Sequence, residues 1–163
     1  MAAQLNALAA ELGEQLMNRQ ATLVTAESCT GGWIAKVLTD IPGSSAWFDR
    51  GFVTYSNAAK QQMLGVREQT LSTQGAVSAA TVSEMAKGAL AHSDAALSVA
   101  VSGVAGPGGG TPEKPVGTVW LAWSVRGGKL LTECRLFSGD RTAVRRQTVE
   151  RSLHVLLALA KAL

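Results

Sequence analysis

Residues that build disulfides, metal sites and histidine-dependent active sites are scarce in this 163-residue chain. It has only two cysteines, Cys29 and Cys134, and two histidines, His92 and His154. Two cysteines make no disulfide framework, and no cluster of His, Cys or carboxylate residues has the spacing of metal ligands. Neither histidine follows a predicted strand, which argues against a Ser-His-Asp triad. We therefore expect no metal and no other cofactor.

Long apolar runs and strongly charged segments are also missing. No stretch approaches the ~18 consecutive apolar residues that a membrane span needs. The first 16 residues (MAAQLNALAAELGEQL) are amphipathic and acidic, unlike a secretory signal. The net charge is +3, and only RTAVRR (141–146) is locally basic, too short for a general nucleic-acid surface. We expect a cytoplasmic protein that binds neither membrane nor nucleic acid, and a small anionic ligand would explain the basic stretch.

The residues that are plentiful predict one α/β domain over residues 1–163. Hydrophobic residues make up 47% of the chain against 17% charged ones, which excludes a disordered chain. Apolar steps of three and four indicate helices, and short β-branched or alternating runs indicate strands. Predicted helices cover 3–19, 30–43, 57–65, 78–93 and 140–163; predicted strands cover 21–27, 50–56, 95–103, 118–125 and 130–137, the last two joined by a hairpin at RGGK. Their order predicts a mixed sheet with helices on both faces.

The stretch AESCTGG (26–32) lies between the first predicted strand and the helix that follows it. Ligands bind at this edge of open α/β sheets, so Ser28 is a candidate nucleophile. Ser28 or Thr30 could instead cap the helix, as serine and threonine commonly do. Gly31 and Gly32 favour a functional reading, because glycines in a helix cost about 1 kcal/mol each unless something must approach the backbone.

A serine nucleophile needs a base, and Lys60 is the best candidate. It lies one helical turn after the strand at 50–56, in a helix that Asn57 is expected to cap and Gly65 to end. A buried lysine can be neutral and accept a proton, whereas a lysine on the surface would simply be solvated. Cys29 is a rival nucleophile, with a small buried core residue as its alternative role.

Two further segments offer groups that bind anions. The loop SGVAGPGGGT (102–111) has many unhindered main-chain N–H groups, as a phosphate nest or oxyanion hole requires, although it lacks the P-loop pattern. A flexible surface loop is the alternative. Arg141 and Arg145 share one face of the last helix, which we expect Ser138 or Asp140 to cap. They could clamp a phosphate or form an ordinary solvated face.

Several stretches together resemble the CinA C-terminal domain family, over nearly the whole chain. They are TAESCTGGW, GSSAWFDRGFVTYSNAAK, LGV, GAVS, SGVAGPGGGTPEKPVGTVW and SGDRTAVRRQ. Many members of that family have isoleucine at position 104 and an acidic residue at position 108, where this chain has Val104 and Gly108. These two differences affect the shape of the loop. The resemblance implies a three-layer α/β/α fold with a mixed, mostly parallel sheet ending in a β-hairpin.

The resemblance also implies an amidohydrolase that converts nicotinamide mononucleotide to nicotinic acid mononucleotide and ammonia, in pyridine-nucleotide recycling. It implies catalysis by Ser28, Lys60 and Tyr55, with neutral Lys60 taking the serine proton directly or through Tyr55. The residues expected around the substrate are Thr30, Gly31, Ser45, Ser102, Gly103, Gly106, Arg141 and Arg145. A non-catalytic nucleotide-binding module and a purely structural or oligomer-forming domain are the alternatives. The expected partners are the nucleotide substrate and, in a homo-oligomer, further copies of the chain.

Overall fold

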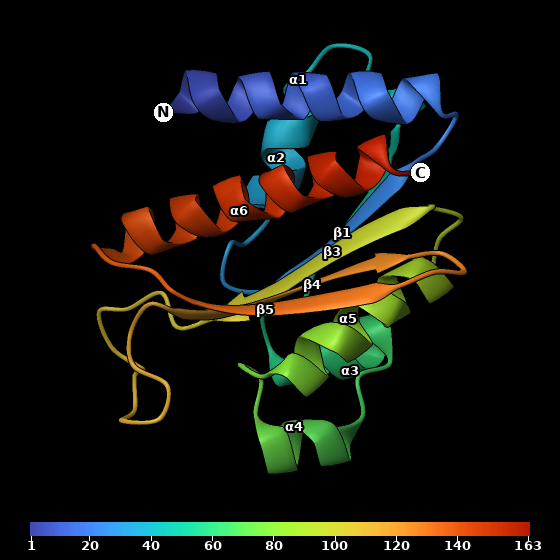
Figure 1. Cartoon of the computed structure of the whole chain (residues 1–163). Helices are drawn as coiled ribbons and strands as arrows, with labels where there is room; N and C mark the ends of the chain where they lie inside the picture. The colour runs from blue at the N-terminus through green and yellow to red at the C-terminus, as the bar shows by residue number, and fades with distance from the viewer.

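The computed structural model describes all 163 residues and has a five-stranded sheet with helices on both faces (Figure 1). Its order is β2 (Phe48–Val53), β1 (Leu23–Glu27), β3 (Leu97–Gly103), β4 (Thr118–Val125) and β5 (Leu130–Leu136). β1 pairs in parallel with β2 and β3, whereas β4 pairs antiparallel with β3 and β5. The predicted mixed sheet and its terminal hairpin are confirmed. Two pairs of neighbouring strands are parallel and two are antiparallel.

The helices form a layer on each side of the sheet. α2 (Trp33–Thr39) and α6 (Arg141–Lys161) lie on one side, and α1 (Ala2–Asn18) packs across them (Figure 1). α3 (Asn57–Leu64), α4 (Glu68–Gln74) and α5 (Ala79–Ala91) lie on the other side. The three-layer arrangement is therefore confirmed. None of the helices combines the length and the apolar character that crossing a membrane would need.

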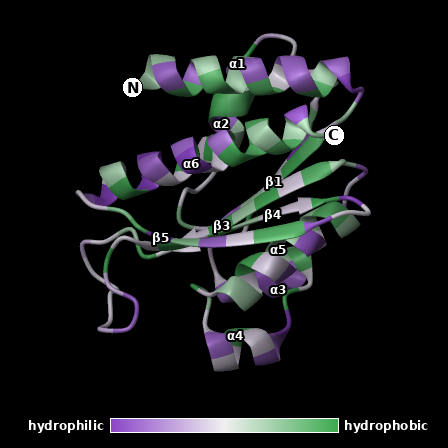
Figure 2. Cartoon of the chain, in the orientation of Figure 1, coloured by the Kyte–Doolittle hydropathy of each residue, from purple (hydrophilic) through white to green (hydrophobic).

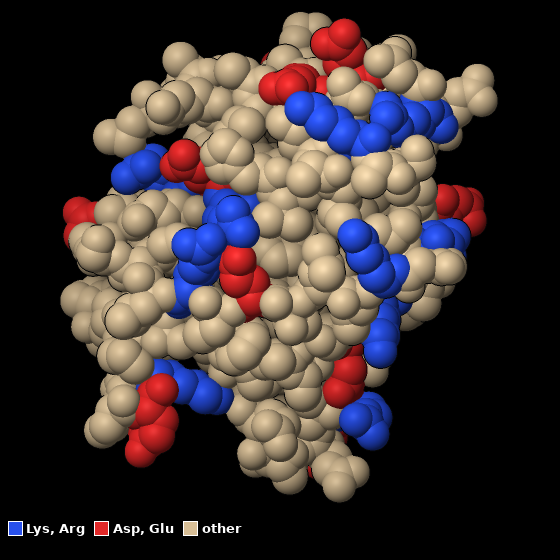
Figure 3. Space-filling model, viewed as in Figure 1, with Lys and Arg blue, Asp and Glu red and all other residues tan.

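Each face of the sheet has its own hydrophobic core, because side chains alternate along the strands. Val99 and Val101 of β3 belong to the core beneath α1, α2 and α6, which also buries Trp47. Ala100, between them, belongs to the core on the α5 side. Figure 2 shows hydrophobic colour concentrated on the strands and on parts of the helices, while α4 is mostly hydrophilic. On the face in Figure 3, acidic and basic side chains are intermixed.

Element ends differ from the predictions where turns replace regular structure. α2 begins at Trp33 rather than near residue 30, because Gly31 and Gly32 adopt positive φ angles of 60° and 104°. β2 ends at Val53, so residues 54–56 connect it to α3. The short helices α4 and η1 (Ser44–Ala46) were not predicted. Both lack the apolar period that indicates a helix.

The helix caps are partly as predicted. Gly65 ends α3 with a φ of 71°, and the Asp140 side chain caps α6 by accepting the N–H of Ala143 at 2.9 Å. The cap of α3 is Ser56, whose Oγ accepts the N–H of Ala59 at 3.0 Å, so the prediction for Asn57 was wrong. Asn57 is instead the first residue of the helix.

Candidate active site

The turn after β1 leaves the Ser28 hydroxyl free of any capping role. The N-cap residue of α2 is Gly32, and neither Ser28 nor Thr30 caps the helix. Buried Glu27 supplies the acceptors instead, taking the N–H groups of Ile34 and Ala35 at 2.9 and 3.1 Å. The Thr30 hydroxyl also donates to Glu27. Sequence analysis missed Glu27, although a carboxylate just before a glycine-rich helix start is a recognisable signal.

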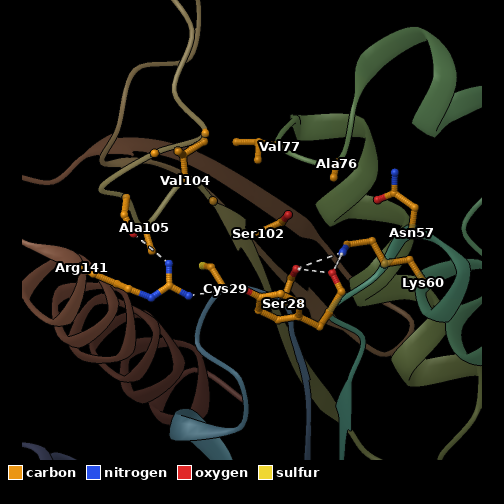
Figure 4. A pocket seen from close by; sticks show the side chains of 15 residues that line it. Ser28, Cys29, Asn57, Lys60, Ala76, Val77, Ser102, Val104, Ala105 and Arg141 are labelled. Carbon is orange, nitrogen blue, oxygen red and sulfur yellow. Dashed lines mark hydrogen bonds between the residues drawn. The ribbon is translucent and has the colours of Figure 1, made fainter.

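Lys60 lies directly beside Ser28. It is 1% exposed, and its Nζ is 2.9 Å from Ser28 Oγ (Figure 4). The same Nζ is 2.9 Å from the carbonyl oxygen of Thr54 and 3.1 Å from that of Tyr55. The two carbonyls can only accept, so they take two N–H bonds of the amine. A neutral amine then directs its lone pair at Ser28. Burial lowers the pKa of Lys60, which favours that neutral form.

Cys29 does not have the surroundings of a reactive thiol. It is buried, and burial raises its pKa to about 11. The thiol is therefore protonated at neutral pH, and a protonated thiol is a poor nucleophile. The geometry favours Ser28.

The Tyr55 hydroxyl is not part of the Ser28–Lys60 contact. Its side chain is largely exposed, and the hydroxyl accepts a hydrogen bond from Nη2 of Arg141 at 3.2 Å. Only the main-chain oxygen of Tyr55 reaches the dyad, at 3.1 Å from Lys60 Nζ and 3.5 Å from Ser28 Oγ. The structure thus brings Lys60 to Ser28 without an intervening phenol.

A cavity of about 290 Å³ opens over the dyad at the carboxyl ends of β1 and β3. Its basic side chains are Lys60 and Arg141, and no carboxylate lines it. Asn57 also lines it, an amide that sequence analysis considered only as a cap. Of the residues expected around the substrate, Ser102, Gly103, Gly106 and Arg141 lie here.

Two segments that line this cavity contain main-chain N–H groups that donate to no other residue. The N–H of Cys29, directly after Ser28, donates to no other residue. The same holds for four residues of the glycine loop, which we define as residues 104–117: they are Ala105, Gly106, Gly108 and Gly109. Free N–H groups stabilise negative charge, so the cavity has one donor beside the serine and several on the opposite wall.

The two arginines of α6 have different environments. Arg141 lines the cavity and donates to the carbonyl of Gly106 at 2.8 Å. Arg145 donates to the carbonyls of Cys29 and Thr30, each at 3.0 Å, and its guanidinium lies 5.5 Å from the ring centre of Trp33. Arg141 can reach a ligand in the cavity, whereas Arg145 holds the turn that carries Ser28.

Besides Arg145, three residues expected around the substrate lie outside the cavity. Ser45 is exposed in η1, before β2 and therefore at the amino edge of the sheet, opposite the cavity. Thr30 is buried with its hydroxyl on Glu27. Gly31 is exposed, and a Cβ there would lie 3.5 Å from Arg145 Nη2, so its role is to let the turn form beneath the arginine.

The fold and the site together define an α/β domain with a serine–lysine dyad at the carboxyl edge of a mixed sheet. Residues 5–160 match the family model described as the CinA C-terminal domain. The chain belongs to that family.

Two kinds of relative show how far the similarity extends. The chain is 58% identical over 153 residues to the nicotinamide-nucleotide amidohydrolase PncC of Escherichia coli K12, covering 94% of this chain and 93% of that protein. The PncC of Pseudomonas putida is also 58% identical, with 93% and 94% covered. The crystal structure of the competence/damage inducible protein CihA from Agrobacterium tumefaciens superposes with a TM-score of 0.93 at 50% identity, covering 96% and 95% of the two chains.

Proposed function

We propose that this protein is an amidohydrolase that converts nicotinamide mononucleotide to nicotinic acid mononucleotide and ammonia through an acyl-enzyme on Ser28. The observation that carries the proposal is the 2.9 Å contact between buried Lys60 and Ser28 at the floor of the cavity. The names of the relatives support the substrate, because high identity extends over nearly the whole chain. We infer that this reaction serves pyridine-nucleotide recycling in the cytoplasm.

Acylation begins with proton transfer from Ser28 to the neutral amine of Lys60. The serine oxygen attacks the carboxamide carbon, and the N–H of Cys29 stabilises the negative charge that develops on the carboxamide oxygen. Lys60 then protonates the leaving nitrogen, the C–N bond breaks and ammonia departs. No other proton carrier is needed, because the two side chains are already in contact.

Deacylation reverses these roles. Water gives a proton to Lys60 as its oxygen attacks the ester carbon, and Lys60 returns that proton to Ser28 as the ester bond breaks. The product is a carboxylic acid that ionises at neutral pH.

The phosphate of the substrate would bind at the wall opposite Ser28. Arg141 offers a guanidinium there, and the glycine loop offers the unpaired N–H groups of residues 105, 106, 108 and 109. A guanidinium and convergent N–H groups are the usual ligands of phosphate. Arg145 is committed to main-chain carbonyls and is not needed for this contact.

The test is ammonia release from nicotinamide mononucleotide by wild-type protein and by Ser28→Ala. We expect turnover in the wild type and none in Ser28→Ala, because the covalent path is lost while Glu27 still caps α2. Ser98→Ala is a matched control, since Ser98 is buried in the same sheet but its hydroxyl is bonded to the carbonyl of Ala86. Binding of the nucleotide without ammonia release by the wild type would instead identify a nucleotide-binding module.

A further inference from the structure

The cavity holds a second buried serine whose hydroxyl the fold itself does not use. Ser102 is 2% exposed, lines the cavity and makes no side-chain hydrogen bond within the protein. Figure 4 shows its side chain among those that line the cavity. Ser98, on the same strand, bonds its hydroxyl to the carbonyl of Ala86 at 2.9 Å. Buried hydroxyls normally have partners, so the free one in a cavity points to a ligand.

The sheet register places Ser102 beside Ser28. Glu27 of β1 is paired with Val101 of β3, and the N–H of Ser28 continues this ladder by donating to the carbonyl of Val101 at 3.1 Å. The next row therefore contains Ser28 and Ser102 on neighbouring strands. Alternation puts Ser102 on the same face as Ala100, which is the face that α3 and its Lys60 cover.

We propose that Ser102 positions first the leaving nitrogen and then the hydrolytic water, a role that rests on the proposed function. The leaving ammonia and the incoming water occupy the same place on the reacting carbon, because one step reverses the geometry of the other. Lys60 exchanges a proton with that atom in both steps. A second neighbour is needed to hold the atom in line, and Ser102 borders the cavity where it must lie.

A hydroxyl acceptor suits both steps. In acylation, Ser102 Oγ accepts one N–H of the carboxamide, which leaves the nitrogen lone pair free to take the proton from Lys60 as the C–N bond breaks. In deacylation, Ser102 Oγ accepts one O–H of water, whose other proton goes to Lys60 while its lone pair forms the new C–O bond. The ester bond to Ser28 then breaks, and Lys60 returns the proton to Ser28. Ser102 gains and loses no proton overall.

The two steps can be separated with the methyl ester of nicotinic acid mononucleotide. Its leaving group is methanol, which has no N–H for Ser102 to hold, so acylation does not depend on this residue. We expect Ser102→Ala to show a methanol burst as fast as in the wild type, followed by steady-state turnover about 100-fold slower. Intact mass spectrometry should then show the acyl group accumulating on the enzyme.

Matched variants distinguish positioning from a structural effect. Ser98→Ala should keep wild-type steady-state turnover, and Ser102→Thr, which retains a hydroxyl, should recover much of the turnover that Ser102→Ala loses. Wild-type steady-state turnover in Ser102→Ala, or an equal loss in burst and steady state, would overturn the proposal for Ser102. If the wild type released no ammonia from nicotinamide mononucleotide, the proposed function itself would fail, which is a separate outcome.

Discussion

The two segments that border the cavity, residues 28–32 and the glycine loop, are held in different ways. The first is fixed by buried or partly buried side chains: Glu27 binds the start of α2, and Arg145 binds the carbonyls of Cys29 and Thr30. The glycine loop is bonded at its two ends, where the N–H of Gly117 donates to the carbonyl of Val104 at 2.8 Å, and Arg141 holds the carbonyl of Gly106 at 2.8 Å, but residues 105–109 donate no main-chain hydrogen bond.

This difference is consistent with the proposal that one segment carries the chemistry and the other binds the substrate. Catalysis needs the nucleophile held within a fraction of an ångström of its productive position, and the 28–32 turn is built for that. Recognition of an anion needs several free donors, and the glycine loop leaves those N–H groups unpaired. Substitutions on the turn side should therefore lower kcat, whereas those on the loop side should raise KM.

The largest effect is expected at Lys60. Lys60→Arg keeps a positive charge but cannot accept the Ser28 proton, so kcat should fall by about 10²- to 10⁴-fold. A base must be neutral to accept the proton, so under the proposed mechanism activity should rise with pH through the lowered pKa of Lys60 and fall on its acidic side. Steady-state rates of the variant and of the wild type across pH would measure the loss of kcat and the pH dependence. A folded Lys60→Arg enzyme with wild-type kcat would exclude Lys60 as the base, and circular dichroism would verify folding.

Arg141→Ala should affect substrate binding rather than the chemical step. Losing a charged hydrogen bond to phosphate should raise KM for nicotinamide mononucleotide by about 10- to 100-fold and leave kcat nearly unchanged. Nicotinamide riboside, which lacks the phosphate, is the control substrate, because its KM should respond little to the change. An equal rise in KM for both substrates would show that Arg141 acts through the shape of the glycine loop, since it also binds Gly106.

Arg145 lies one helical turn further along α6, and Arg145→Ala should affect the chemical step rather than substrate binding. It removes two hydrogen bonds to the turn that carries Ser28 and the contact with Trp33. We expect kcat to fall about tenfold with KM little changed, and the free energy of unfolding to fall by about 1–3 kcal/mol. Kinetics and urea denaturation would measure these. A change confined to KM would contradict the division of labour between the two arginines.

The smallest effect is expected at Cys29. Burial keeps its thiol protonated, with a pKa raised to about 11, and its contribution to the site is its main-chain N–H. Cys29→Ala retains that N–H and should keep most of the wild-type kcat. Inactivation of a folded Cys29→Ala protein, seen in the same ammonia assay, would transfer the nucleophile assignment to cysteine.

The sequence predicts the elements and the dyad better than the surroundings of the dyad. Apolar and β-branched patterns located ten of the twelve helices and strands approximately, but α4 (EQTLSTQ) is too polar to show an apolar period. Lys60 and Leu64 are buried one turn apart on α3, a shared face that could have indicated an inward lysine. The separate roles of Arg141 and Arg145 depend on Cys29, Thr30 and Gly106, which are distant in sequence and give no local signal.

The buried amine of Lys60 also sets how the stability of the protein depends on pH. Its acceptors are a hydroxyl and two carbonyls, with no carboxylate to compensate a charge, and its folded-state pKa lies below the unfolded value of about 10.4. Between these two pKa values the unfolded chain binds the extra proton, so stability rises with pH across that window, and below it the penalty is complete. Lys60→Met should therefore melt at a higher temperature than the wild type near neutral pH, while being inactive. The group that we propose as the catalytic base is one that folding alone would have selected against.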